Sequence, residues 1–328
     1  MRIKWSLAVV VVLLFSIFWV RAQERPEAKA ADKPAADLKA QAKDEQAESP
    51  KFIRLRRDDN AKPLAMETAV IRFISPARPG VAVDLIGAVH IADKGYYDEL
   101  NKLFESYEVL LYELVAPEGT KIPKEGRKGG GAHPIGALQD GMGTLLGLQH
   151  QLACIDYSKA NFIHADMSPE EFSKTMASRG ESFMQMFLRM MGQGMAQQAA
   201  GTQGAGSDAA LLFALFSRDR ATKLKIAMAE QFENLEGQLT VLDGPDGSTI
   251  ITERNRKCFE VLDKQLKDGK KKIGVFYGAG HFPDMEKRLA ADFGMKRESE
   301  KWLTAWLLAQ KRADPPPAGE KPKDEAKP

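Results

Sequence analysis

The chain has 328 residues, of which 47 are basic and 45 acidic, so its formal net charge at pH 7 is only +2. With this balance the chain has no excess positive charge that would attract nucleic acids or acidic substrates. We therefore expect no nucleic-acid partner. The hydrophobic share of 44% is ordinary for a packed core, and the length suffices for one large domain or two ordinary ones.

Residues 1–22 have the pattern of an export signal. A short basic start precedes an apolar run at residues 5–20, and Ala22 ends a small-x-small site of the kind that a signal peptidase cleaves. The alternative is an uncleaved anchor that tethers the chain to a membrane through residues 5–20, but this run is shorter than the roughly 20 apolar residues that a span needs. Both alternatives predict an exported protein that is periplasmic, secreted or membrane-anchored.

Two segments flank the part of the chain that can fold. Residues 23–50 and 313–328 consist mainly of Ala, Lys, Glu, Asp and Pro, with almost no large apolar side chain. Such segments bury too little apolar surface to offset the entropy of the chain. We therefore predict a disordered linker, a folded domain at 51–312 and a disordered tail. An oxidising compartment would permit a disulfide between Cys154 and Cys258, but the sequence leaves their pairing open.

The first part of the domain is predicted to form two strands followed by a helix. Apolar runs at 66–75 and 80–88 predict two strands, joined by a turn rich in proline and glycine. After His90, apolar side chains recur at spacings of three and four, which predicts an amphipathic helix. The run at 108–115 then predicts a buried strand, so strand, Gly-x-x-His, helix and strand form a βαβ unit with a parallel pair of strands.

A mainly helical insertion is expected at 168–236, because Ser168 is followed by proline and two acids, the signature of a helix start. The Met-rich segment at 183–195 is read as an apolar helix face, which leaves a role as a lid or partner surface open. Further on, 251–269 predicts a helix and 271–277 a strand.

The strand at 271–277 runs into a second Gly-x-x-His that ends at His281. Another helix follows, and a last amphipathic element of unspecified type lies at 299–310. The sequence therefore predicts an α/β fold, with a central mixed sheet, βαβ units, flanking helices and the helical insertion.

Both Gly-x-x-His motifs occupy the same structural position, the carboxyl end of a strand just before a helix. Sites in open α/β sheets form outside the carboxyl ends of strands, where a histidine can bind a metal or act as a base near neutral pH. His90 and His281 are thus candidate metal ligands. Glu113 lies near the end of the run at 108–115, and since a carboxylate inside an apolar run is costly to bury unless it is paired or bound to a metal, we expect it at the exit of the strand.

A second candidate group is Glu253-Arg254-Asn255, at the start of a helix. The glutamate could act as a ligand or base, and the arginine could hold a substrate carboxylate or a developing oxyanion.

Each of these signals also has a purely structural interpretation. A single Gly-x-x-His is common, and the three residues from Glu253 to Asn255 could be solvated residues of a first helical turn. His133 and His150 are expected to be surface or loop residues, and His164 is left open. Asp166 could face the site, but we favour a local helix cap.

Three blocks of the sequence resemble the TraB/PrgY/GumN and TIKI superfamily. They are "LIGAVHIADKGYYDELNKLFESYEVLLYELV", "ITERNRKCFEVLD" and "GVFYGAGHFPDMEKRL", and "NFIHADMSPEEF" is similar to a further family segment. The resemblance covers roughly residues 66–310. It implies an α/β core with helical insertions and a metal-dependent hydrolase site, which in the TIKI branch cleaves proteins with a divalent cation such as manganese or cobalt.

By position, the resemblance makes His90 and His281 the motif histidines and Glu113 the glutamate after the first helix, while Glu253, Arg254 and Asn255 match the second block. The expected function is an exported metal-dependent hydrolase, a peptidase acting on a peptide or protein. His90, His281 and Glu113 would hold one manganese, cobalt or zinc-like ion.

In this hypothesis the catalytic residues are Glu113, Glu253, Arg254 and Asn255, and Glu113 shares the roles of ligand and base. The alternatives are a non-enzymatic metal- or haem-binding exported protein, and a membrane-tethered interaction protein with a vestigial site. The oligomeric state is left open.

Overall fold

The computed structural model describes residues 52–117, 119–120, 122, 146–182, 219–243 and 247–309. The predicted export signal, linker, tail and Met-rich segment lie outside these residues. Within the described ranges, no helix has both the length and the apolar character needed to cross a membrane.

The elements follow one another from a strand-rich beginning to a strand at the end. The strands are β1 (Ile53–Arg57), β2 (Pro63–Ile74), β3 (Ala82–Ala88), β4 (Ile91–Ala92), β5 (Val109–Tyr112), β6 (Gln149–His150), β7 (Phe162–His164), β8 (Lys272–Gly278) and β9 (Lys296–Leu307). The helices are α2 (Lys94–Phe104), α4 (Gln151–Cys154), α5 (Pro169–Ser178), α8 (Arg220–Asp243), α9 (Arg254–Lys267) and α10 (Phe282–Ala291), with the short turns η1 (Thr249–Glu253) and η2 (Ala279–His281).

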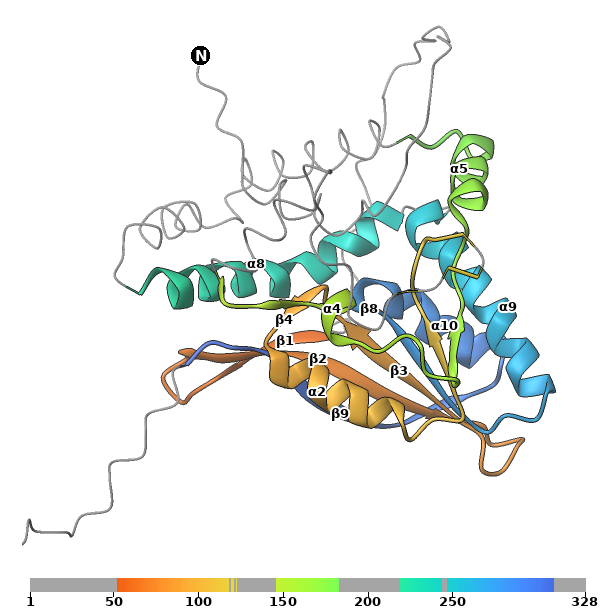
Figure 1. Ribbon diagram of the computed structural model, residues 1–328, viewed down its shortest axis with the longest axis horizontal. Coiled ribbons are helices and arrows are strands. Elements are labelled where there is room, and N and C mark those ends of the chain that lie inside the picture. The colour runs from red at the N-terminus through yellow and green to blue at the C-terminus, as the bar shows by residue number, and fades with distance from the viewer. Residues whose placement is uncertain are drawn as a thin grey trace, which may run out of the picture.

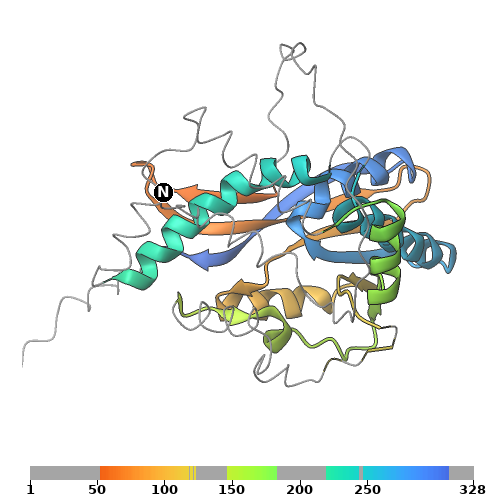
Figure 2. The same ribbon diagram turned by 90° about the horizontal axis from the view of Figure 1, so that it is seen from above.

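A mixed sheet of seven strands forms the centre of the fold, in the order β1-β2-β3-β8-β5-β7, with β9 also paired to β2 (Figure 1). The strands β1, β3 and β9 run antiparallel to β2, whereas β3, β8, β5 and β7 run parallel to one another. Helices flank the sheet (Figure 2). The predicted α/β class with a central mixed sheet is therefore confirmed.

The βαβ unit differs from the expectation in one respect. β3 and β5 are parallel, but they do not pair, because β8 lies between them and pairs with both. The register aligns Ala88 with Gly278 and Tyr112 with Phe276. A strand from the far end of the chain therefore brings the second Gly-x-x-His motif directly beside the first.

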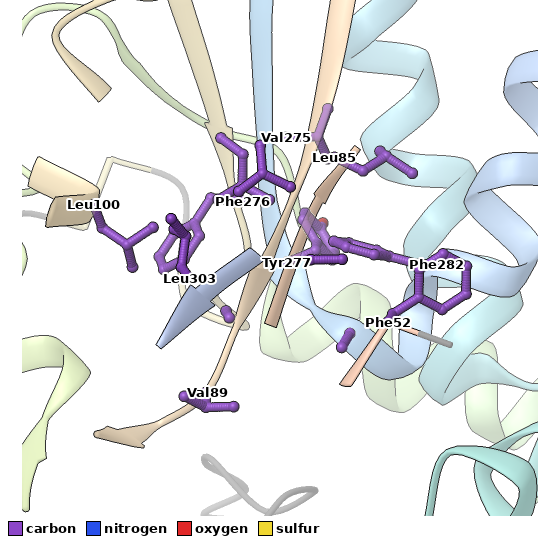
Figure 3. Close-up of a cluster of buried hydrophobic side chains, with 14 of the residues drawn as sticks. Phe52, Leu85, Val89, Leu100, Val275, Phe276, Tyr277, Phe282 and Leu303 are labelled. Atoms are coloured by element: carbon purple, nitrogen blue, oxygen red, sulfur yellow. The ribbon is translucent and has the colours of Figure 1, made fainter. Parts of the chain in front are cut away.

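The core has two layers of side chains, one on each side of the sheet. Successive residues of a strand point to opposite faces, and Figure 3 shows Leu100 of α2 and Phe282 of α10 on opposite sides of the central strands. The Phe282 ring packs edge-on against Phe52, with 5.4 Å between ring centroids. β8 is buried on both faces, as expected for a central parallel strand.

The helical insertion and the last element also have described parts. Helices α5 and α8 lie where a mainly helical segment is predicted, although α8 continues to Asp243. The last element, whose type the sequence leaves open, is the strand β9, and its first half is exposed while its second half enters the core.

Candidate active site

The carboxyl ends of β3, β8 and β5 lie next to one another and carry the candidate residues. Glu113 directly follows β5, and its backbone N–H still donates to the Phe276 carbonyl of β8 at 3.1 Å. Its side chain then turns toward the second motif, where Glu113 Oε2 accepts a hydrogen bond from the Gly278 backbone N–H at 2.7 Å. The sheet register thus places this carboxylate at the start of the second Gly-x-x-His.

Arg254, the first residue of α9, joins two carboxylates. Its Nη2 donates to Glu113 Oε1 at 2.7 Å and to Asp166 Oδ2 at 2.6 Å, and its Nε donates to Asp166 Oδ1 at 2.9 Å. Burial alone would lower the pKa of the Arg254 guanidinium, but Asp166 and Glu113 raise it well above its usual value. The Arg254 guanidinium therefore stays protonated, and its charge is paired with two carboxylates of the protein itself.

Asp166 does not cap the following helix, contrary to the favoured interpretation. The N-cap of α5 is Ser168, whose side chain accepts from the Glu171 backbone N–H while the Glu171 side chain accepts from the backbone N–H of Ser168. Asp166 is buried and faces Arg254 instead. Because the capping box already satisfies the helix end, the carboxylate of Asp166 is available for the site.

Asn255 fixes the orientation of His281. Its Nδ2 donates to the His281 carbonyl at 3.0 Å and to Asp284 Oδ2 at 2.8 Å, so its Oδ1 is the atom that faces His281 Nδ1, at 2.6 Å. Since Oδ1 can only accept, His281 Nδ1 carries the proton. In the neutral ring Nε2 is then unprotonated, and it lies 3.6 Å from Glu113 Oε1.

The charges around Glu113 set its ionisation. Burial alone would raise the pKa of Glu113, but Arg254, His281 and His90 outweigh this effect and hold the pKa well below its usual range. Burial lowers the pKa of His90, Glu113 opposes that effect, and Arg254 adds to it. The register that aligns Ala88 with Gly278 places both motif histidines near Glu113, and the two pKa shifts leave the carboxylate ionised and His90 neutral at neutral pH.

His90 has neighbours that the sequence does not reveal. The short strand β4, directly after His90, pairs with β6, so that Ile91 lies opposite His150. The next residue, Gln151, donates its backbone N–H to the His90 carbonyl at 2.9 Å. His150 is therefore a half-buried residue of a strand pair beside the first motif, which corrects the expectation of a surface or loop residue. Polar residues in so short an element carry no periodicity that could have indicated this contact.

Not every predicted residue joins the cluster. The carboxylate of Glu253 lies 2.9 Å from Arg256 Nε and 3.4 Å from Arg179 Nη1, and it makes no described contact with Glu113 or His281. His164 ends β7 at the same edge of the sheet, where its Nε2 is 2.5 Å from the Leu114 carbonyl.

The cluster fits a metal ion only in part. No group of three or more His, Cys, Asp or Glu side chains within the described ranges has the spacing of a metal site. However, the 3.6 Å between His281 Nε2 and Glu113 Oε1 is close to the separation of two ligands on one ion, since each bond is about 2.0–2.2 Å long. The residues therefore provide a suitably spaced pair of donors rather than a complete set.

The geometry defines an α/β protein with a buried, charged histidine–carboxylate cluster at the carboxyl ends of its parallel strands. No family model, no curated protein and no solved structure matches the chain.

Proposed function

We propose that this chain is an exported metal-dependent hydrolase, a peptidase, whose active site is the cluster at the ends of β3, β8 and β5. The observation that carries the proposal is the approach of His281 Nε2, on a ring that Asn255 orients, to within 3.6 Å of the ionised Glu113 carboxylate. The resemblance to the TraB/PrgY/GumN and TIKI superfamily supports it, because it selects the same residues. Export is proposed from the signal pattern of residues 1–22.

In this proposal, His281 and Glu113 are the first two ligands and His90 is the third. A bound divalent metal would polarise the scissile carbonyl and lower the pKa of a water molecule. Asn255 holds His281 with Nε2 turned toward Glu113, and outer partners of this kind typically matter almost as much as the ligands. Arg254, which Asp166 holds in turn, fixes Glu113 in place and helps to keep it ionised.

The depressed pKa of Glu113 bears on its role. A general base works best when its pKa is near the operating pH, whereas Glu113 is held well below the usual range. Glu113 is thus better suited to binding a cation than to taking up a proton, and His90, whose lowered pKa keeps it neutral, can offer an unprotonated ring nitrogen to the same cation. Arg254 supplies a positive field, although its hydrogen bonds to two carboxylates leave it less suited to binding a substrate carboxylate.

The test combines metal analysis with cleavage assays. Protein comprising residues 23–328 is purified without chelator or a metal-binding tag, its metal content is measured, and a peptide library is incubated with it in manganese, cobalt or zinc. We expect cleavage that a chelator abolishes and that His281→Ala and Glu113→Gln each reduce at least about 100-fold, which corresponds to roughly 2.7 kcal/mol of transition-state stabilisation.

The matched control is Glu260→Gln, which changes an exposed glutamate of α9 and should leave cleavage unchanged. Cleavage that survives the chelator, or both site variants, would contradict the proposal. A visible absorption band on haem titration without any peptide cleavage would support the non-enzymatic alternative instead.

A further inference from the structure

The two motif histidines lie in comparable surroundings. At His281, the hydrogen bond that orients the ring is formed. A side-chain amide from a separate element, that of Asn255, fixes the ring of His281. A second buried amide, that of Gln151, lies beside His90. The sequence gives no reason to single out Gln151, because it falls outside both motifs and outside the blocks that resemble a known family.

Two hydrogen bonds hold Gln151 in this place. Its backbone N–H donates to the His90 carbonyl at 2.9 Å, immediately after the strand pair β4–β6. Its side-chain Nε2 donates to the Tyr157 hydroxyl at 2.7 Å. Tyr157 is itself buried, with its ring 5.1 Å from that of Tyr112 and 5.7 Å from that of Phe162. The amide is therefore anchored from both its backbone and its side chain.

The other polar atom of this amide, Gln151 Oε1, indicates what the residue does. The residue is only 6% exposed, and this oxygen has no well-formed hydrogen bond among the described residues. A buried carbonyl oxygen without a donor is costly, and such an atom in a folded protein calls for an explanation. The contact of the Gln151 side chain with His90 favours a proton on the imidazole, so a ring N–H of His90 is the donor that suits it.

We infer that Gln151 is the positioning residue of His90, as Asn255 is of His281, with its Oε1 accepting a ring N–H of His90 and Tyr157 fixing the amide. Hydrogen bonds of this kind are often long or misaligned before ligand binds and shorten in the complex. The bond holds the ring in one tautomer and leaves its other nitrogen unprotonated for the site. The inference deepens the proposed function and rests on it for the metal that this nitrogen would bind.

The experiment reads the tautomer and the metal affinity separately. Ring-nitrogen NMR shifts of isotope-labelled, metal-free protein report which nitrogen of His90 carries the proton, and calorimetric titration with Mn²⁺ and Zn²⁺ reports affinity. The variants are Gln151→Met, which keeps the length but removes the acceptor, Gln151→Glu, which retains an acceptor, and Tyr157→Phe, which removes the anchor. Gln265→Met, at another buried glutamine outside the cluster, is the matched control.

We expect wild type, Gln151→Glu and Gln265→Met to show one His90 tautomer, and Gln151→Met to show a mixture and to bind metal about 10- to 100-fold more weakly. Tyr157→Phe should lie between these extremes, and it tests the same link if Gln151→Met does not fold. A single tautomer and unchanged affinity in both Gln151→Met and Tyr157→Phe would overturn the inference, as would a tautomer mixture in wild type. A third outcome separates the two proposals. If wild type binds no metal, and His90 has one tautomer in wild type but a mixture in Gln151→Met, the proposed metal-dependent hydrolase is contradicted and the positioning role of Gln151 is supported.

Discussion

Arg254 links two carboxylates of the site, those of Glu113 and Asp166. It is buried, and its guanidinium donates to two carboxylates that are themselves shielded from solvent. Breaking such a buried pair from one side leaves uncompensated charge in a medium of low dielectric constant, which costs far more than the pair itself contributes. The neighbouring Arg256 provides a contrast, since it pairs with Glu253 and Glu260 at the surface.

Replacing Arg254 with methionine should therefore destabilise the protein strongly. Because Glu113 and Asp166 would both lose their cation, we expect Arg254→Met to lower the free energy of unfolding by about 3–5 kcal/mol at neutral pH, measured by urea denaturation. Arg256→Met, the surface control, should change it by less than about 1 kcal/mol. Equal losses in the two variants would show that the buried network does not stabilise the fold.

The ionised state of Glu113 predicts a specific pH dependence. Its pKa in the folded protein lies below the value of about 4.3 expected in the unfolded chain, so its contribution to stability is present above that pH and is lost as the pH falls through the folded pKa. The difference in unfolding free energy between wild type and Glu113→Gln should thus be largest near neutral pH and shrink below about pH 4. Urea denaturation across this range measures it, and a difference that grows on acidification would contradict it.

The sequence predicts part of this site and misses the rest for identifiable reasons. His90, His281 and Glu113 can be found because each follows an apolar strand, where sites of α/β sheets form. The partners of Arg254 cannot, since they lie 88 and 141 residues away along the chain. Asp166 was misassigned because local capping patterns are visible in a sequence, whereas long-range ion pairs are not.

At the scale of elements, the insertion of β8 between β3 and β5 creates the site. Gly274, the third residue of β8, makes this close packing possible. A Cβ atom there would lie 2.6 Å from Leu110 Cδ1, 3.0 Å from Tyr107 Cδ2 and 3.1 Å from Ile86 Cδ1. Side chains of both neighbouring strands and of the segment before β5 therefore fill the space above this glycine.

Gly274→Ala should consequently be destabilising, although alanine normally stabilises regular structure relative to glycine. We expect a loss of about 1–3 kcal/mol in the free energy of unfolding, because the surrounding side chains are buried and must shift together. The control is Gly95→Ala on α2, where a Cβ would meet nothing within 4 Å and a gain of about 0.5–1 kcal/mol is expected. Urea denaturation of both variants measures the difference, and a stabilising Gly274→Ala would refute this account of β8.

For the molecule as a whole, hydrophobic periodicity predicts the α/β class but not the order of the strands. Alternation and apolar runs identify β2, β3, β5 and β8 individually, whereas their neighbours depend on which faces meet in three dimensions. β9 illustrates the limit most clearly. Its first half is charged and exposed on both faces, so its pattern did not distinguish a strand from a helix.

β9 links the C-terminal end of the described chain to the first motif. It pairs with β2 from Lys296, opposite Ile74, to Leu307, opposite Ala65. Near the end of β9, the indole of Trp306 is only 1% exposed and donates to the Ile91 carbonyl, next to His90, at 2.7 Å. A residue distant in sequence thus supports the segment that carries the first histidine.

Trp306→Ala should therefore affect both stability and the site. Loss of a buried aromatic side chain typically costs about 3–5 kcal/mol of unfolding free energy. The Ile91 carbonyl would also lose its donor, which should broaden or shift the ring signals of His90 in NMR spectra.

Trp302→Ala, on the same strand, is the matched control. Its ring is only partly buried and packs under the Arg54 guanidinium at 4.1 Å, a contact worth about 0.5–1 kcal/mol at exposed sites. If Trp302→Ala destabilised the fold as much as Trp306→Ala, or if the His90 signals responded equally to both, the stability of the first motif would not depend on this particular link. The larger effect of Trp306→Ala on both readouts would instead establish that the final strand holds the first Gly-x-x-His in place.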